Sequence, residues 1–386
     1  MSPKSKKEYL SAILLRYQKA RRREKSKILD ELCAICHYNR KYAIRTLQNL
    51  GNPKPPKTKR RPGRKSPYRS PELIQILKKI WIDAHLPCGK RLKPILPLWL
   101  PSYQIEFGEI TQEILKKLSE ISPATIDRVL KPTRHFYRGK GRCATKPGLL
   151  LRHHIPIKTN QWDEKKPGFL EADTVHHCGT SLAGIYAVTL NTTDIATGWT
   201  EQRATYGLGH YDIFLGIKDI EKSLPFPLLG LDSDNGGEFL NKNVYRYLTH
   251  RKAPVQFTRS RPYFKNDNAH VEGKNWTHVR QWLGYRRFEH PDIVLCLNNL
   301  YKNQWRLFHN FFMPSAKLRE KQRIGSKIVK IHDSPKTPYQ KILESKSIPD
   351  ATKCSLTRLF KTLNPFRLRK IIDEKISEIH RMARLP

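Results

Sequence analysis

The stretch "LDSDNGGEFL" (residues 231–240) places three carboxylates, Asp232, Asp234 and Glu238, around an Asn-Gly-Gly turn. Asp, Asn and Gly favour turns for conformational reasons alone. Carboxylates at the end of a strand are also the ligands that a hard divalent cation needs. The apolar run before the acids predicts a buried strand that ends at Asp234, so the stretch is either a solvated turn or one side of a metal site.

The surrounding pattern predicts a mixed sheet. Three strand-like runs with turns between them precede the stretch, at residues 168–177, 185–194 and 199–206. A helix around 209–223 leads to the strand that ends at Asp234. After it the pattern predicts a helix at 241–251, a strand at 255–260 and long helices at 266–288 and 291–312. Three meandering strands followed by alternating helices and strands are typical of a five-stranded mixed sheet with helices on both faces.

Two further acids stand out in these elements. Asp173 lies inside the first strand, where an ionised group is costly to bury unpaired. Glu272 lies in the first turn of the helix at 266–288. If the first and fourth strands are neighbours, Asp173 and Asp234 come side by side, and the helix brings Glu272 to the same point. Asp232 is an alternative to Asp234, and Asp267 is an alternative to Glu272.

Polar neighbours of these acids are candidates for supporting roles. Side chains alternate along a strand, so His177 is expected on the face of Asp173 and His176 on the other face. Both histidines are interpreted as structural or supporting groups, with contact to metal or phosphate as the alternative. Near Glu272, DNA contacts are expected from Asn268, Lys274, Asn275 and Arg280, while Lys274 and Arg280 also fit a solvated helix face.

The charge of the chain indicates a polyanionic partner. The 386 residues include 73 Lys plus Arg against 34 Asp plus Glu, a formal net charge of +39. Such an excess is typical of nucleic-acid-binding proteins.

Seven scattered cysteines argue against a disulfide framework and for a reducing compartment. No apolar run approaches the ~18 residues of a membrane span, so we expect a cytoplasmic, nucleoid-associated protein of bacterial type without membrane contact.

The first 50 residues predict a helix-turn-helix. A basic helix at 8–23 is followed by an apolar helical stripe at 26–37 and a second short helix from residue 40. DNA contacts are expected from that helix, through Arg40, Lys41 and Arg45. The "CAICH" segment (33–37) also matches a haem-attachment or zinc pattern, but its cysteines fall on the apolar stripe and no second ligand pair lies nearby.

The segments beyond it alternate between basic connectors and helices. Residues 51–70 read as a basic, Pro-rich linker, which is either a tether or a minor-groove arm. Residues 71–145 predict a second helical DNA-binding domain, which contains a helix-turn-helix candidate that stops at Pro132 and a basic connector at 134–142. Residues 323–386 are basic and predicted to be mainly helical. DNA-contacting residues expected in the linker, this second domain and its connector are Arg60, Arg61, Arg64, Arg128, Arg138 and Lys140.

Three segments together resemble a known family. "EADTVHH" (171–177), "SDNGGEF" (233–239) and "YFKNDNAHVEGKNW" (263–276) are similar to the integrase catalytic core of DDE transposases and retroviral integrases over residues 160–322. The 38 positions between Asp234 and Glu272 are close to the spacing usual in that family. The hairpin before residue 50 resembles the N-terminal helix-turn-helix of bacterial insertion-sequence transposases. The His-His-Cys-Cys zinc module of the retroviral type is not found in order.

The resemblance implies a fold, a reaction and partners. It implies an RNase H-like core in which Asp173, Asp234 and Glu272 hold two Mg²⁺ (or Mn²⁺) ions, with Asp173 bridging them. It implies hydrolysis at an element end, followed by attack of the freed 3′ hydroxyl on target DNA. The partners would be double-stranded DNA of the terminal inverted repeats and of the target, with at least a dimer on DNA. A domesticated, catalytically silent DNA-binding regulator and a structure-selective nuclease are the alternatives.

Overall fold

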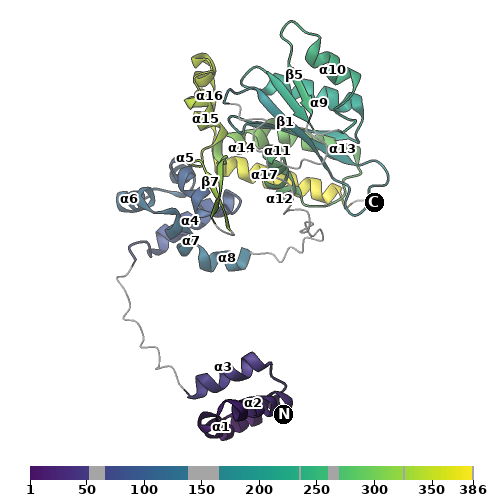
Figure 1. Cartoon of the computed structure of the whole chain (residues 1–386). Helices are drawn as coiled ribbons and strands as arrows, with labels where there is room; N and C mark the ends of the chain where they lie inside the picture. The colour runs from purple at the N-terminus through teal and green to yellow at the C-terminus, as the bar shows by residue number, and fades with distance from the viewer. Residues whose placement is uncertain (52–65, 138–164, 234–235, 260–268, 325–326, 385–386) are drawn as a thin grey trace. The chain divides into compact units, whose positions relative to one another are not determined.

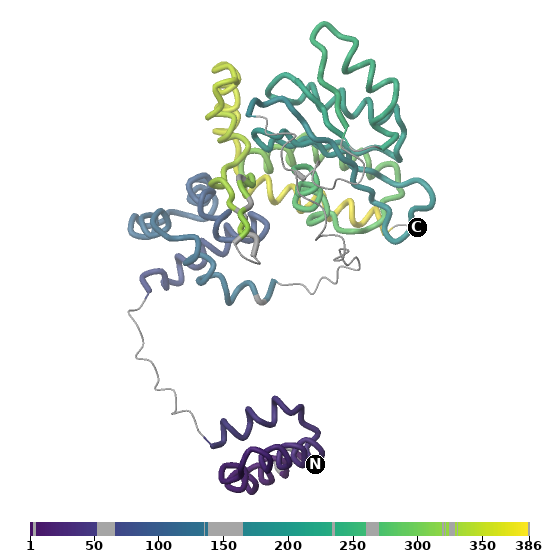
Figure 2. Tube along the Cα trace, in the orientation of Figure 1, coloured from purple at the N-terminus to yellow at the C-terminus, as the bar shows by residue number. Residues whose placement is uncertain are grey.

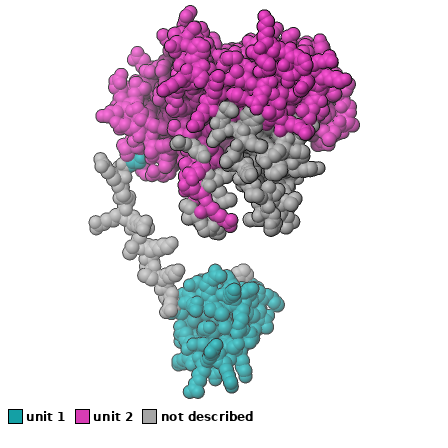
Figure 3. Space-filling model, turned by 45° about the horizontal axis from the view of Figure 1, so that its top comes forward, with its two compact units in different colours: residues 1–66 teal, residues 67–386 magenta. Residues whose placement is uncertain are grey.

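The computed structural model describes residues 1–51, 66–137, 165–233, 236–259, 269–324 and 327–384. The chain forms two compact units, residues 1–66 and residues 67–386, called here the N-terminal unit and the main unit (Figure 3). Several residues that the sequence singles out lie outside the described residues, namely Arg60, Arg61, Arg64, Arg138, Lys140, Asp234, Asp267 and Asn268.

The N-terminal unit is a group of three helices, α1 (Pro3–Lys19), α2 (Arg22–Cys36) and α3 (Arg40–Gly51). His37 ends α2 in the left-handed conformation with φ of 53°. The unit has its own apolar core, and Cys36 is fully buried in it while Cys33 packs against it. The two cysteines therefore serve packing, as their place on the apolar stripe predicts. The core consists of Leu10, Ile13, Ile28, Leu29, Leu32, Cys36, Ala43 and Leu47.

A five-stranded mixed sheet is the centre of the main unit (Figure 1). Its strands are β1 (Phe169–His176), β2 (Ala187–Asp194), β3 (Thr200–Tyr206), β4 (Gly230–Ser233) and β5 (Gln256–Arg259). They lie in the order β3-β2-β1-β4-β5, with β2 antiparallel to its neighbours and β4 and β5 parallel to β1. The predicted sheet is confirmed, and so is the neighbourhood of the first and fourth strands, in which Ala172 lies opposite Ser233.

Helices cover both faces of this sheet. On one face lie α9 (His210–Ser223) and α10 (Lys242–Thr249). Gly216 lets α9 approach closely, because a Cβ there would lie 3.1 Å from Leu190. The other face is covered by a continuous helix formed by α11 (Ala269–Lys274), the π-helical η1 (Asn275–Arg280) and α12 (Gln281–Leu283), called here the site helix. Beside it runs a second continuous helix made of α13 (Pro291–Leu300), the π-helical η2 (Tyr301–Trp305) and α14 (Arg306–Phe312).

The rest of the main unit is helical except for one hairpin. Before the sheet come α4 (Pro71–Asp83), α5 (Gly89–Phe107), α6 (Gln112–Glu120), α7 (Pro123–Val129) and α8 (Lys131–Tyr137). After it come β6 (Leu318–Ile324), β7 (Lys327–His332), α15 (Pro338–Glu344), α16 (Asp350–Thr362) and α17 (Pro365–Met382). None of the helices in the described part of the chain combines the length and apolarity needed to cross a bilayer.

Two local predictions need correction. Helix α7 ends at Val129, before Pro132 as predicted, but a further helix, α8, begins at Lys131 and extends into the expected connector. Proline suits the first turn of a helix because its missing N–H has no partner to lose there. The C-terminal region, predicted to be mainly helical from residue 323, begins inside the antiparallel pair β6–β7.

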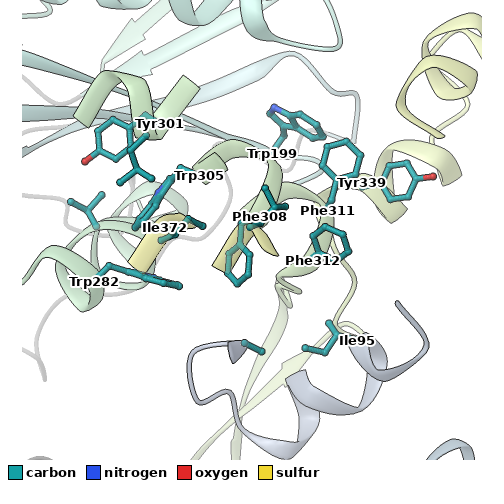
Figure 4. Packing of buried hydrophobic residues seen from close by; sticks show 14 of the residues in the cluster. Ile95, Trp199, Trp282, Tyr301, Trp305, Phe308, Phe311, Phe312, Tyr339 and Ile372 are labelled. Carbon is teal, nitrogen blue, oxygen red and sulfur yellow. The ribbon is translucent and has the colours of Figure 1, made fainter. Parts of the chain in front are cut away.

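One hydrophobic core runs through the whole main unit. Trp99 of α5 packs edge-on against Phe308 and Phe312 of α14 and Phe366 of α17, with ring centroids 5.0 to 6.2 Å apart. Figure 4 shows part of this core, with Phe308, Phe311 and Phe312 of α14 beside Ile95 of α5 and Ile372 of α17 among the labelled residues. Helix α17, the yellow trace in Figure 2, contacts both α5 and α13. The predicted second helical domain and C-terminal region thus share a core with the sheet, and the boundaries predicted between them stay predictions.

Candidate active site

Asp173 lies half-buried on β1, on the face of the sheet that the site helix covers. Its Oδ2 accepts a hydrogen bond of 2.6 Å from the side-chain amide of Asn275. Its Oδ1 accepts a bond of 2.8 Å from the backbone N–H of Thr174. The carboxylate is therefore held in a fixed orientation by the helix that carries Glu272.

Asn275 belongs to a chain of side-chain hydrogen bonds across the sheet. The Nδ2 of Asn191 donates to the Oδ1 of Asn275 at 2.7 Å, and the Nε2 of Gln202 donates to the Oδ1 of Asn191 at 2.9 Å. Asn191 is the register partner of both Asp173 and Gln202. Because Asn191 and Gln202 are buried, these bonds form away from water, where they are strong and direction-specific. The network joins three strands to the site helix.

Glu171 is a buried acid that the sequence reasoning missed. It shares the face of Asp173 and is only 1% exposed. Its Oε2 accepts hydrogen bonds of 2.9 Å from the backbone N–H groups of both His270 and Val271, in the first turn of the site helix. Burial raises the pKa of Glu171 to about 8, opposed by these bonds and assisted by the charges of Asp232 and Glu272. The alternation of side chains along β1 could have identified Glu171, because it places residues 171 and 173 on the same face of the sheet.

Asp232, the alternative to Asp234, lies beside Glu171 in the parallel register of β1 and β4. It is 1% exposed, and its Oδ1 accepts a hydrogen bond of 2.7 Å from the hydroxyl of Thr258 on β5. Asp232 is thus a buried group under the site helix. Asp234 itself lies outside the described residues, but the strand that leads to it is the immediate neighbour of the strand that carries Asp173.

Glu272 is exposed in the first turn of α11, three residues before Asn275. The structure therefore brings the strand of Asp173 and the helix of Glu272 together through the Asn275 bond. Within the described ranges, which lack Asp234, no three His, Cys, Asp or Glu side chains converge to hold a metal ion. A site with three acids thus depends on the contribution of Asp234.

His176, the last residue of β1, and His177, which follows it, contact different groups. His177 is fully buried, and its Nε2 lies 2.9 Å from the hydroxyl of Thr189, while its ring stacks on Phe288. Burial lowers the pKa of His177 to about 3. The Nδ1 of His176 lies 3.1 Å from the hydroxyl of Tyr186. Both rings are engaged with protein groups, which fits the structural interpretation.

The cations expected to meet DNA fall into two groups. Arg280 is half-buried, donates to the carbonyl oxygen of His176 at 2.7 Å and lies over the ring of Tyr285. Lys274 is half-buried beside His278, with 3.3 Å between Nζ and Nε2. Burial, with the charges of Arg91 and Lys341, lowers the pKa of Lys274 to about 7. These two side chains are anchored in the protein.

The other group lies on the surface. Lys41 and Arg45 of α3 and Arg128 of α7 are exposed. Arg40 is also exposed but is tied to α2, since it bonds Ser26 at 2.7 Å and pairs with Asp30. Lys41, Arg45 and Arg128 are therefore the expected DNA-contacting side chains that project from the described surface.

Comparison with known proteins places the chain in a family. A protein of Sinorhizobium fredii (strain NBRC 101917 / NGR234), named "Uncharacterized protein y4rM", is 37% identical over 333 residues, which are 86% of this chain and 93% of that protein. The chain belongs to the family of that protein. No family model matches the chain.

Two solved structures are similar to part of the chain. One is the catalytic core domain of BIV integrase, which is 17% identical with a TM-score of 0.28. The match covers 46% of this chain and 95% of that chain. The other is the HTLV-2 integrase catalytic core domain in complex with magnesium, with 15% identity, 39% and 90% covered, and a TM-score of 0.28. Such scores are too low to carry an inference, so the fold rests on the strand order given above.

Proposed function

We propose that this chain is a DNA transposase that cleaves the ends of a mobile element and joins each freed 3′ hydroxyl to target DNA. The observation that carries the proposal is the hydrogen bond of 2.6 Å from Asn275 to Asp173. It fastens the helix of Glu272 to a central strand whose parallel neighbour leads to Asp234. The sheet order β3-β2-β1-β4-β5 also supports the RNase H-like core that the sequence resemblance implies.

The residues present fit a pair of hard cations. Carboxylate oxygens are the ligands that Mg²⁺ and Mn²⁺ accept. The two oxygens of Asp173 accept hydrogen bonds from Thr174 and Asn275, which hold the carboxylate in one orientation, and a carboxylate is an acceptor with about four lone-pair sites. Glu272 is exposed in the first turn of the site helix. Asp173, Asp234 and Glu272 would hold the cations, which when bound activate the attacking oxygen and stabilise the leaving 3′ oxygen.

The chain's own groups supply position and charge. Asn275 holds the Asp173 carboxylate in one orientation, and Glu171 holds the first turn of the site helix through two backbone N–H groups. Water attacks the phosphodiester at the element end and releases a 3′ hydroxyl. That hydroxyl attacks a phosphodiester of the target and displaces its 3′ oxygen. No side chain has to act as a nucleophile.

DNA recognition is assigned to the N-terminal unit and to the α6–α7 pair. Helices α2 and α3 are separated by three residues, and Lys41 and Arg45 project from α3, as in a helix-turn-helix that places its second helix in the major groove. Arg128 projects from α7 in the same way. Joining two element ends to one target requires at least two copies of the chain on DNA.

The test is incubation of the whole protein with duplex DNA of its own element end and Mg²⁺. Wild type is expected to nick the end and to join it to a second duplex. Asp173→Asn, Asp234→Asn and Glu272→Gln should each abolish both steps and leave DNA binding intact, because each removes a metal-binding charge and keeps the shape. The control is Asp292→Asn, which removes an exposed carboxylate at the start of α13.

Other outcomes lead to other conclusions. Full strand transfer by Asp234→Asn would move the metal ligand to Asp232. Nicking without joining would make the protein a nuclease. Binding of the ends with neither step, in Mg²⁺ and in Mn²⁺, would refute the transposase and leave a silent DNA-binding regulator.

A further inference from the structure

A cavity of about 590 Å³ lies in the main unit, along the site helix. Lys274, Thr277 and Gln281 of that helix line it, whereas Asn275 of the same helix bonds Asp173 in the sheet. The remaining walls come from the α4–α5 loop and the start of α5, the end of β2 and the residues after it, α14, residues 313–318, β7 and α15. Its volume is typical of a site for a small molecule.

Cations dominate the wall of this cavity. Arg91, Lys274, Lys317 and Lys341 line it, and among the described lining residues the one acid is Asp194. The oxygens of Asp194 are already engaged, at 2.8 Å by the N–H of Gly168 and at 2.6 and 2.7 Å by Thr197. Neither Arg91 nor Lys274 forms an ion pair with a carboxylate of the residues that the structure describes. Lys341 pairs with Asp333 at 3.9 Å, and the other three cations leave an excess of positive charge in the cavity.

His309 adds a buried polar group without a protein partner. It lines the cavity, is 1% exposed and stacks on His278 with ring centroids 4.0 Å apart. Within the described part of the chain, neither of its ring nitrogens has a hydrogen-bond partner. An unmet buried donor costs about 1–3 kcal/mol. A ligand oxygen that accepts its N–H would remove that cost.

We propose that this cavity binds a phosphate-bearing anion, either a free polyphosphate or nucleotide or a phosphate of a DNA strand. Phosphate oxygens match Lys and Arg donors and the N–H of a neutral histidine. Several phosphate charges can be met at once, since the four cations belong to four different segments of the chain. Trp276, half-exposed at the same cavity, offers an aromatic face to a base. The inference goes beyond the proposed DNA chemistry and does not depend on it.

The test is calorimetric titration of the full chain with inorganic tripolyphosphate at fixed ionic strength and without divalent metal. Wild type is expected to bind one equivalent. Arg91→Gln, and Arg91→Gln combined with Lys341→Gln, should weaken binding by at least about tenfold, because charge-assisted hydrogen bonds are lost. The matched control is Lys90→Gln, which removes an exposed cation one residue earlier on α5 that does not line the cavity. Its affinity should stay within about twofold of wild type.

A second titration separates the two sources of phosphate. Displacement of tripolyphosphate by a short DNA duplex, lost in Arg91→Gln, would identify a DNA phosphate as the occupant. Simultaneous binding of duplex and tripolyphosphate would identify a free anion. The absence of saturable binding to wild type, or an equal loss in Lys90→Gln, would overturn the proposal, because the attraction would then be diffuse surface charge. The assay contains no cleavage step, so a failure of the transposase chemistry leaves its result unaffected.

Discussion

The two sides of the site helix differ in charge. Towards the sheet, Asn275 bonds Asp173, and the first turn of the helix donates to Glu171. Along the cavity, Lys274 lies with Arg91 and Lys341. The acids that contact the helix thus lie towards the sheet, and the cations lie along the cavity.

The difference shows that this helix is not an ordinary amphipathic one. A surface helix usually buries an apolar stripe and exposes a polar face. Here apolar contact comes from a few residues, such as Val271, Val279 and Leu283, while polar groups occupy both flanks. Oxygen acceptors on one flank suit cations, and nitrogen donors on the other suit anions. Substitutions on each flank test whether the two act independently.

The largest effect is expected on the acid side. Glu272→Gln should lower DNA cleavage at least about a thousandfold, since the charge that binds a cation is lost. Tripolyphosphate binding should stay within about twofold of wild type, because the cavity keeps all its cations. Cleavage assays and calorimetry on the same preparation measure both. A parallel loss of anion binding would mean that the two flanks are not independent.

The next effect concerns what holds the helix in place. Trp282 is 8% exposed, stacks on His85 at 4.0 Å and lies under the guanidinium of Arg369 at 4.4 Å. Trp282→Ala should destabilise the main unit by about 3–5 kcal/mol in urea unfolding. Trp276→Ala on the same helix is the control, because Trp276 is 51% exposed and should cost less than about 1 kcal/mol. Equal costs would show that the helix is held mainly from the sheet.

A smaller effect is expected from the amide that links helix and sheet. Asn275→Leu should weaken apparent Mg²⁺ affinity in the cleavage assay by about 10–100-fold, because Asp173 loses the group that orients it. Raising Mg²⁺ should restore much of the rate, which a misfolded variant would not allow. Thr277→Val, whose hydroxyl donates to the carbonyl of Gly273 and lies 2.9 Å from the Nδ1 of His278 but does not bond Asp173, should cleave like wild type. A rate that Mg²⁺ leaves unchanged would contradict a positioning role.

The smallest effect is a pH dependence on the cavity side. Burial holds the pKa of His309 well below its ordinary value of 6.5. The folded state keeps the ring neutral, whereas the unfolded chain takes up a proton below pH 6.5. The contribution of His309 to the free energy of unfolding is therefore complete above pH 6.5 and is lost as the pH falls. Urea unfolding at pH 7.5, 6 and 5 gives the free energy of unfolding as a function of pH. Its slope should be shallower in His309→Phe than in wild type, by up to about 1.4 kcal/mol per pH unit. The pKa values of His85, His177 and His278 are also lowered, so these residues account for the slope that remains in the variant. Identical slopes would contradict the assignment.

The sequence predicted the elements of the sheet well because their signals are local. The period-two runs at 168–177 and 185–194 and the apolar strand before Asp234 became β1, β2 and β4. The side-by-side placement of β1 and β4 followed from the order of elements. Asp173 and Glu272 were singled out because an acid inside a strand and an acid in the first turn of a helix are both visible in a few residues.

The supporting groups were missed because their partners are distant in sequence. Asn275 lies 102 positions from Asp173, and His270 lies 99 positions from Glu171. His309 looks like an ordinary core histidine until the cavity beside it is known. Strand β6 was missed because four of its seven residues, "LREKQRI", are charged and carry little apolar alternation.

The π-helical turn at Asn275–Arg280 lies in the middle of the site helix. Such turns bond i to i+5 and act as an extra residue accommodated within a helix. The residues after it are therefore out of phase with those before it, by about 100° relative to an unbroken 3.6-residue repeat. Removing one residue here would give an ordinary helix of almost the same length but would rotate Trp282 relative to Glu272. In a relative of this protein, the number of residues in this segment would therefore decide which side chain meets which partner, more than the types of those residues would.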